Sequence, residues 1–406
     1  MNDPQTPAPG RSFDVVVVGG GPAGATAAHD LARRGLTVLL LDRAGRIKPC
    51  GGAIPPRLIA DFEIPAAQLV ARATCARMVS PSDKRVDIPI EGGFVGMVDR
   101  ETFDEFLRER AAQAGALRQT GRFERIDRDS DGMAVVRWQS EGPAGTHHAA
   151  ARARMVIGAD GARSAVAKQC VPGAEEGRFV FAYHEVVRTP DEPPPGYDPQ
   201  RCDVVYCGEL SPDFYGWVFP HGPTASVGTG SADKGFSLRN ATAELRRRSG
   251  LAGATTVRRE GAPIPMKPLP RWDNGRDVLV VGDAAGVVAP ASGEGIYYAM
   301  ASARMGAEAV AEALARRDGR RLARARKQFM REHGRVFWVL GIMQHFWYRN
   351  DRRRERFVDI CRDRDVQQLT FDAYMHKRLV RRRPMAHVRI FFKDMAHLLG
   401  LARVGG

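Results

Sequence analysis

Residues 13–43 read "FDVVVVGGGPAGATAAHDLARRGLTVLLLDR", and this stretch carries more structural information than any other part of the chain. Its valine run, Val15–Val18, is typical of a strand that is buried on both faces. A glycine-rich turn and an alanine-rich helical segment follow, and Gly35 marks the end of that helix. Thr37–Leu41 is a second apolar strand with Asp42 at its end. This order predicts a βαβ unit that binds a dinucleotide.

The glycines of the turn each have a physical reason. Gly19 permits the tight turn, Gly21 lets the backbone approach a pyrophosphate, and Gly24 lets the helix pack close to the strand. The helix N-terminus offers free N–H groups and the positive end of its dipole to the phosphates. Asp42 stands about 20 residues on, where an acid accepts hydrogen bonds from ribose hydroxyls. The candidate cofactor contacts in this unit are Gly19, Gly21, Ala23, Gly24, Asp42 and Arg43.

Two later glycine-rich turns also follow apolar strands. "GADG" (158–161) follows the apolar strand Met155–Ile157, and "GDAAG" (282–286) follows Val278–Val281. Asp160 either contacts the cofactor or caps a helix, because Asp-Gly turns are common. Asp283 has little other reason to interrupt an apolar strand, so we predict a cofactor contact there. "SGEGI" (292–296), which contains Gly293, Gly295 and Ile296, opens a long alanine-rich helix.

The remaining patterns predict an α/β fold in which a Rossmann-type domain is interleaved with a second, antiparallel-sheet domain. We expect a short strand and an amphipathic helix over 94–116, a strand pair around 121–139, and an antiparallel sheet over 172–262. A chain of 406 residues with 44% hydrophobic side chains is long enough for two domains. Part of residues 50–100 can belong to either domain, and the sequence leaves this assignment open. The predicted divisions are a disordered lead (1–12), a nucleotide-binding domain (13–171 and 263–315), a substrate domain (172–262) and a basic helical C-terminal region (316–406).

The positive charge of the chain is concentrated at its C-terminal end. The formal net charge is +14, and the residues from Arg316 onward hold 24 Lys and Arg against 9 Asp and Glu. Such a region is either a solvated face or a site for an anionic partner, namely acidic lipid headgroups, a diphosphate or nucleic acid. The arginine clusters at 352–354 and 381–383 are the candidates for contact with an acidic membrane surface.

No segment reaches the roughly 20 apolar residues that span a bilayer. The most apolar late run, "VFWVLGIMQHFWY" (336–348), can lie on a membrane, line an apolar pocket or fill a core. The six cysteines include no CxxC pair, which indicates reduced thiols in a cytoplasmic protein, and no metal site is predicted. The first residues, "MNDPQTPAPG", have no basic stretch before an apolar run, so we expect a short disordered lead and not a signal peptide.

Two short motifs carry the candidate chemistry. "KPCGGAIP" (48–55) is either a tight turn or a reactive strip, with Cys50 as its reactive group. "YGWVFP" (215–220) places Tyr215, Trp217 and Phe219 on one face of a strand. Alternating aromatic side chains fill a core or line the site of a long apolar ligand, and the two roles are compatible.

The three glycine-rich elements at 19–24, 158–161 and 282–286 together resemble those of the p-hydroxybenzoate-hydroxylase-type FAD flavoproteins, over about residues 13–315. The resemblance implies FAD, with Asp42 at the adenosine ribose, although Glu is more usual there. It also implies that Arg100, in "VDRETFDEFL", lies near the pyrophosphate and ribityl chain of FAD, and that Asp283 contacts the ribityl chain. A solvated arginine at a helix start is the alternative for Arg100. Gly293–Ile296 would bring a helix dipole to the isoalloxazine, where it stabilises the anionic reduced flavin.

Within that superfamily, "YGWVFP" and the "PCGG" of "KPCGGAIP" resemble the Y-x-W-x-F-P and P-x-C-G-G motifs of geranylgeranyl reductases. The region from Phe337 to Leu401 resembles the C-terminal extension of the plant and photosynthetic-bacterial branch, which makes the phytyl chain of chlorophylls. The resemblance implies a reductase of (bacterio)chlorophyll biosynthesis that saturates isolated double bonds of a geranylgeranyl chain with NADPH as electron donor. The substrate would be geranylgeranyl diphosphate or geranylgeranylated (bacterio)chlorophyll.

Other functions share part of these motifs. A reductase of archaeal-type isoprenoid glycerolipids shares both reductase motifs, and an FAD-dependent aromatic monooxygenase shares the FAD motifs alone. A flavin-dependent halogenase would carry a W-x-W-x-I-P segment, which the chain lacks. The intact FAD signature argues against a vestigial flavin fold that binds nucleic acid, so we expect no nucleic-acid partner. The expected location is cytoplasmic, with peripheral contact to the inner or photosynthetic membrane through the basic C-terminal region.

Reduction of an isolated alkene needs a proton as well as a hydride, because the alkene has no carbonyl to polarise it. An acid beside the flavin is therefore wanted. Cys50 is the candidate, since a thiol buried in apolar surroundings stays protonated, and a packing role is the alternative. Gly51, Gly52 and Ala53 would let the backbone lie against the flavin ring.

Overall fold

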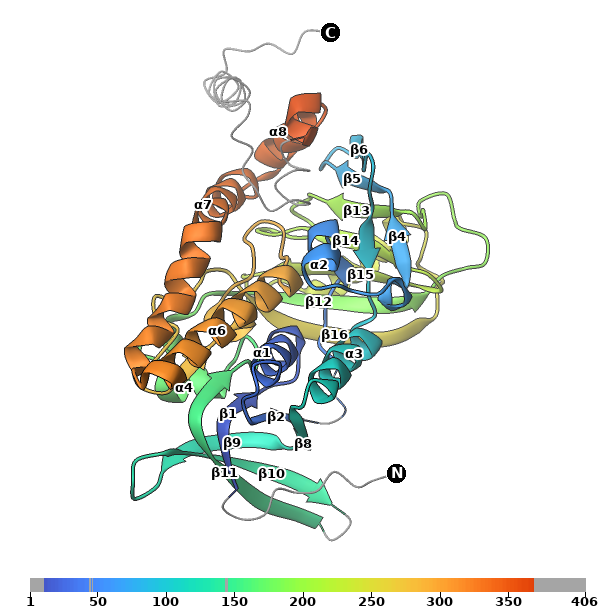
Figure 1. Ribbon diagram of the computed structural model, residues 1–406. Coiled ribbons are helices and arrows are strands. Elements are labelled where there is room, and N and C mark those ends of the chain that lie inside the picture. Colours follow the sequence, from blue (N-terminus) through green and yellow to red (C-terminus); the bar gives the residue numbers. More distant parts are fainter. Residues whose placement is uncertain (1–10, 44, 46, 143–144, 369–406) are drawn as a thin grey trace.

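The structure is a computed structural model that describes residues 11–43, 45, 47–142 and 145–368. Two large sheets organise the chain, and helices cover the first of them (Figure 1). The predicted fold class is confirmed: a Rossmann-type α/β unit is interleaved with a mainly antiparallel sheet, and helices follow at the C-terminal end. Residues 1–10 of the predicted lead lie outside the described residues, whereas Ser12 already belongs to the first strand.

The first sheet has the strand order β8-β2-β1-β11-β10-β9, with β17 also paired to β11. Strands β8, β2, β1, β11 and β17 run parallel, whereas β10 and β9 add an antiparallel extension. The bounds are β1 (Ser12–Val18), β2 (Val38–Asp42), β8 (Leu117–Thr120), β9 (Arg122–Arg128), β10 (Ala134–Gly142), β11 (Gly145–Gly158) and β17 (Val278–Val280).

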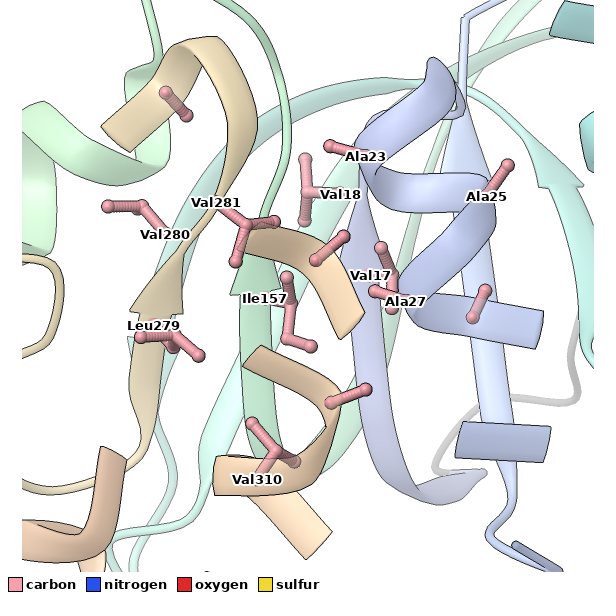
Figure 2. Packing of buried hydrophobic residues seen from close by; sticks show 14 of the residues in the cluster. Val17, Val18, Ala23, Ala25, Ala27, Ile157, Leu279, Val280, Val281 and Val310 are labelled. Atoms are coloured by element: carbon pink, nitrogen blue, oxygen red, sulfur yellow. The ribbon is translucent and has the colours of Figure 1, made fainter. Parts of the chain in front are cut away.

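Helices pack on this parallel sheet because its strands are apolar on both faces. Helix α1 (Pro22–Ala32) lies against α6 (Ile296–Arg316) and α3 (Arg100–Gln113). Figure 2 shows Val17, Ile157 and Leu279 of the neighbouring strands β1, β11 and β17, which form one hydrophobic cluster with the alanines of α1 and Val310 of α6. A Cβ at Gly306 would lie 2.7 Å from Val281 Cγ1, so a glycine lets α6 approach the sheet closely.

The second sheet has the order β16-β12-β15-β14-β13-β5-β6 and is antiparallel except for the β13–β5 pair. The strands are β5 (Cys75–Val79), β6 (Arg85–Pro89), β12 (Phe179–Arg188), β13 (Arg201–Val205), β14 (Gly216–His221), β15 (Thr224–Ser231) and β16 (Thr256–Pro265). Strands β5 and β6 come from the segment that the sequence left open, and β16 crosses the predicted limit at 262. The predicted domain limits therefore stay a prediction.

Smaller elements complete the fold. A three-stranded sheet, β3-β7-β4, contains Ala53–Ile54, Val95–Met97 and Ala71–Ala73. Helix α5 (Leu238–Arg248) interrupts the stretch for which only strands were predicted. The other helices are α2 (Pro56–Asp61), α4 (Ala165–Cys170), α7 (Ala323–Trp347) and α8 (Asp351–Ile360), and the 3-10 turns are η1 (Ala66–Gln68), η2 (Ala174–Glu176), η3 (Gly282–Ala285) and η4 (Gly319–Leu322).

The C-terminal helices join the two sheets. Helix α7 packs beside α6 and leads to α8, which lies against β6 at the edge of the second sheet (Figure 1). Among the described residues, none of the helices is both long enough and apolar enough to cross a membrane. The cluster at 381–383 lies outside the described residues.

Candidate cofactor and substrate site

The glycines of the first turn separate into two kinds. A Cβ at Gly19 would lie 2.9 Å from Asp160 N, and a Cβ at Gly24 would meet the carbonyl oxygen of Gly19, so both glycines are required by packing. A Cβ at Gly21 would meet no described atom within 4 Å. Gly21 is the N-cap of α1, and no side chain of the described residues caps that helix. An uncapped helix N-terminus beside open space fits a pyrophosphate group.

Asp42 lies at the end of β2 against the same turn. A Cβ at Gly20 would be 2.6 Å from Asp42 Oδ2, and the Arg108 guanidinium Nη1 lies 3.3 Å from that oxygen. Burial raises the pKa of Asp42, although Gly20 N–H and Arg108 act in the opposite direction. Ala23 is buried, and Arg43 is exposed. No sequence pattern indicated Arg108, because only the fold brings α3 beside β2.

Asp160 serves as a helix cap. Its carboxylate accepts hydrogen bonds from Ser164 Oγ (2.5 Å), Ala165 N (2.7 Å) and Val166 N (3.2 Å) at the start of α4. Burial raises the pKa of Asp160. Of the two roles that the sequence left open, these contacts favour capping, and a contact with the cofactor stays a prediction.

Arg100 and Asp283 lie in two ion pairs at the edge of one cavity. Arg100 is only 4% exposed and binds Asp104 through Nε (2.8 Å) and Nη2 (2.7 Å), so the alternative of a solvated arginine is wrong. Asp283 is paired with Lys48, which the sequence analysis did not single out. The Lys48 side chain is about one-third exposed, whereas that of Asp283 is almost buried.

The loop before α6 is held by hydrogen bonds from distant elements. Ala291 and Gly293 have left-handed backbones with φ 64° and 65°. The Tyr215 hydroxyl donates to Ser292 O (2.5 Å), the Tyr348 hydroxyl donates to Ala291 O (3.0 Å), and Gln344 Oε1 accepts from Ala291 N (3.1 Å). The loop ends at Gly295, the N-cap of α6, with Ile296 as its first helical residue. Helix α7 therefore positions a loop of the nucleotide-binding unit.

A cavity of about 820 Å³ lies between the second sheet, the loops of the nucleotide-binding unit and α7. The segment Lys48–Ala53 forms one side and the Ser292–Ile296 loop another. Tyr215, Trp217 and Phe219 line it together, with ring centroids 6.1 and 6.4 Å apart in order, so their common face is confirmed. Helix α7 covers the cavity with apolar side chains, which makes its wall mostly apolar.

The strip Cys50–Gly52 lies against the aromatic strand β14. A Cβ at Gly51 would be 3.0 Å from the Phe219 ring. Gly52 has φ 71°, and a Cβ there would lie 2.5 Å from both His221 Nε2 and Val98 O. Gly52 N donates to Cys50 Sγ (3.4 Å). We expected Gly51 and Gly52 to be glycines so that the backbone can approach a flavin ring. Their contacts with Phe219, His221 and Val98 already leave little room for a side chain at either position.

The apolar run at 336–348 takes more than one of its predicted roles. Phe337 belongs to the main core, and Trp347 belongs to the core of the aromatic strand. Trp338 is 68% exposed and Ile342 48% exposed, and both lie at the edge of the cavity.

The arginine cluster at 352–354 is not a uniform surface patch. Arg354 is 2% exposed and donates to the carbonyl oxygens of Pro212 and Tyr348. The prediction that Arg354 contacts a membrane is therefore wrong, because this buried arginine ties α8 to the end of α7 and to the loop that precedes β14. All six cysteines are free thiols, as the sequence predicted.

The fold and the site together define a flavoprotein oxidoreductase. Residues 13–197 match the family described as pyridine nucleotide-disulphide oxidoreductase, and residues 230–388 match the family described as lycopene cyclase protein. A solved geranylgeranyl bacteriochlorophyll reductase-like protein of Thermoplasma acidophilum shares the fold with a TM-score of 0.78, at 22% identity over 93% of this chain and 99% of that one. The flavin-dependent brominase Bmp2 does so with a TM-score of 0.72, at 17% identity over 95% and 99%.

Sequence relatives narrow this class. Geranylgeranyl diphosphate reductase of Rhodobacter capsulatus is 57% identical over 96% of this chain and 98% of that protein. The Synechocystis protein of the same name is 37% identical over 95% and 97%. Digeranylgeranylglycerophospholipid reductase 2 of Methanothermobacter thermautotrophicus is 32% identical over 80% and 84%. The chain belongs to the geranylgeranyl diphosphate reductase family.

Proposed function

We propose that this protein is an FAD-dependent reductase that saturates isolated double bonds of a geranylgeranyl chain, with NADPH as the electron donor. The aromatic-lined cavity of about 820 Å³ beside Cys50 carries the proposal. A polyisoprenoid is long, apolar and flexible, and a mostly apolar pocket of this size is the kind of site that buries such a ligand. The names of the bacterial relatives point to the same substrate.

The residues around the first turn and the cavity fit FAD. Gly19, Gly21, Ala23 and Gly24 would hold the pyrophosphate at α1, with Asp42 and Arg43 toward the adenosine ribose. The residues proposed for the rest of the cofactor are Gly51, Gly52, Ala53, Arg100, Asp160, Asp283, Gly293, Gly295 and Ile296. When bound, FAD supplies the two electrons of the reduction as a hydride equivalent.

The chain itself must supply the proton. Cys50 lines the cavity, and its Sγ–H would donate the proton. The buried Arg100 guanidinium interacts with Cys50, so its positive charge would stabilise the thiolate that remains after the proton is donated. Tyr215, Trp217 and Phe219 would hold the alkene and exclude water from it.

The decisive experiment is anaerobic incubation with NADPH and either geranylgeranyl diphosphate or the geranylgeranylated pigment, followed by the mass of the product. A gain of two mass units for each reduced double bond is expected from one of the two substrates. Reduction of digeranylgeranyl glycerolipid alone would favour the archaeal-type activity. Oxygen consumption coupled to NADPH oxidation, without alkene reduction, would favour a monooxygenase.

The role of Cys50 is tested separately. Cys50→Ser and Cys50→Ala should leave flavin reduction by NADPH unchanged and slow alkene reduction by a factor of about 10² or more, as expected for loss of a general acid. Native rates of alkene reduction in both variants would remove Cys50 from the chemistry and leave it a packing role.

We also propose that the edge of the cavity contacts an anionic membrane. Arg331, Arg335, Trp338 and Ile342 are exposed at helical spacing along α7, and the exposed Arg349 follows the end of that helix. A stripe of cationic and apolar side chains is typical of a helix that lies on a membrane surface. Flotation with anionic liposomes should weaken as salt is added and should fall further in Trp338→Ser. Liposome binding that is unchanged by added salt and by Trp338→Ser would exclude this surface as the membrane contact.

A further inference from the structure

A chain of buried polar side chains lies behind the aromatic wall of the cavity. His184 of β12 is 3% exposed, and its ring lies between two partners on neighbouring strands. Nδ1 is 2.9 Å from Ser226 Oγ on β15, and Nε2 is 2.9 Å from Glu260 Oε2 on β16. Trp217 Nε1, on the cavity wall, lies 3.1 Å from the same Ser226 oxygen. Four strands, β12, β14, β15 and β16, thus bring four polar groups into one hydrogen-bonded chain.

The donors in this chain follow from its first member. An indole N–H can only donate, so Ser226 Oγ accepts from Trp217 and its own O–H is free to donate to His184 Nδ1. While Glu260 is ionised, His184 Nε2–H donates to its carboxylate. When Glu260 carries a proton from solvent it donates to Nε2 instead, His184 holds its own proton at Nδ1, and the Ser226 O–H is free to donate to a water. Arg258 Nε lies 3.3 Å from Glu260 Oε1, and the Glu260 side chain is 14% exposed. The chain therefore runs from the cavity wall to a carboxylate that solvent can reach.

A small second cavity connects this chain with Cys50. It has a volume of about 20 Å³, which is room for one water molecule, and Cys50, His184, Ser226 and Glu260 all line it. His221 also lines it, and burial lowers the pKa of His221 to about 4. Neutral His221 donates Nδ1–H to Phe219 O (3.2 Å), so its Nε2 is an acceptor for such a water. The other charged residues around it are Lys48, Asp99, Arg100 and Arg258.

We infer that Glu260, His184 and Ser226 form a relay that returns a proton from solvent to Cys50 through one water in the small cavity. The inference rests on the proposed function, in which Cys50 gives its proton to the alkene. Histidine suits a relay because it can take a proton at one ring nitrogen and release one from the other.

Each step moves one proton and no electrons. The Cys50 S–H bond breaks as the new C–H bond forms, which leaves a thiolate. The thiolate takes a proton from the water, the water from Ser226 Oγ, and Ser226 from His184 Nδ1, which holds a proton while the protonated Glu260 donates to Nε2. His184 Nε2 is reprotonated from Glu260, which takes a proton from solvent. One solvent proton is consumed for each double bond, while the hydride equivalent comes from NADPH through the flavin.

His184→Gln, Glu260→Gln and Ser226→Ala test the relay in the holoenzyme. Each should reduce kcat for alkene reduction at least tenfold, leave flavin reduction by NADPH and the KM for the isoprenoid nearly unchanged, and alter the solvent isotope effect and pH profile of kcat. Glu260→Asp, which keeps the carboxylate, should recover part of the rate. Glu185→Gln is the matched control, because Glu185 is a buried carboxylate of β12 paired with Arg246 but outside both cavities.

A second readout does not depend on turnover. The rate of Cys50 alkylation in flavin-free protein, followed by mass mapping, should show an extra inflection with pH that is absent in His184→Gln. Native kcat, isotope effect and alkylation profile in all three relay variants would overturn the relay. If Cys50→Ala slows alkene reduction while the relay variants do not, only the relay falls. If Cys50→Ala is also without effect, the proposed acid falls with it.

Discussion

Gly52→Ala measures how tightly the Cys50 strip is packed. Gly52 has φ 71°, in the left-handed region that costs an alanine roughly 1–2 kcal/mol. An alanine also lowers the entropy of the unfolded chain, which returns about 0.4–1 kcal/mol. The added Cβ would lie 2.5 Å from His221 Nε2 and 2.5 Å from Val98 O, closer than van der Waals contact permits. Val98 N also donates to Gly52 O (2.9 Å), so the two segments are tied together and cannot separate freely.

Gly35→Ala is the matched control for the backbone effect. Gly35 has φ 77°, but a Cβ there would meet no described atom within 4 Å. We expect a loss of roughly 1 kcal/mol in the unfolding free energy for Gly35→Ala. Overpacking adds about 1–3 kcal/mol at Gly52. Gly52→Ala should therefore lose about 2–4 kcal/mol.

Urea unfolding of the native protein and both variants, followed by tryptophan fluorescence, gives the difference directly. Equal losses in the two variants would refute the close packing of Gly52 against His221 and Val98. A larger loss of unfolding free energy in Gly35→Ala than in Gly52→Ala would also refute the assignment of extra packing strain to Gly52.

Three further predictions concern acid stability, the C-terminal helices and the loop before α6. Burial lowers the pKa of His221 to about 4, so between pH 6.5 and 4 the unfolded chain binds more protons than the folded one. The unfolding free energy should therefore fall by about 3 kcal/mol as the pH drops through that range. In His221→Gln the unfolding free energy should depend less on pH there, and an unchanged dependence would contradict the prediction. Arg354→Met should cost about 3 kcal/mol in urea unfolding because two buried carbonyls lose their donor, whereas the exposed Arg352→Met should stay within about 0.5 kcal/mol, and similar losses would argue against the tie. Tyr348→Phe removes the hydrogen bond to Ala291 O and should weaken FAD binding about fivefold by fluorescence titration, as loss of about 1 kcal/mol implies; unchanged affinity would show that the loop holds its shape without it.

The nucleotide-binding unit was predictable because its signals are local. A valine run, three spaced glycines and an acid within 31 consecutive residues correspond to β1, α1 and β2 with ends that differ by a residue or a few. The shared face of Tyr215, Trp217 and Phe219 was predictable for the same reason, since alternate residues of one strand point to one side.

Partners from distant segments were not predictable in this way. Lys48 pairs with Asp283 across 235 positions, and Gln344 reaches Ala291 across 53. No pattern within either segment indicates the other, because such pairs depend on how helices and sheets pack. Gly51 shows the same limit: its motif was recognisable, whereas its contact with the Phe219 ring is a property of the fold.

The amino-acid sequence by itself determined the βαβ unit, the mixed fold class, the aromatic face and the kinship of the chain, because each depends on residue types at short, regular spacing. Only the tertiary structure decided that Arg100 is buried beside Asp104, that Asp160 caps α4 and that α7 covers the cavity. It also decided that the Cys50 strip lies next to the Glu260–His184–Ser226 chain. The physical reason is that burial and hydrogen bonding arise between segments far apart in the sequence, which only packing brings together.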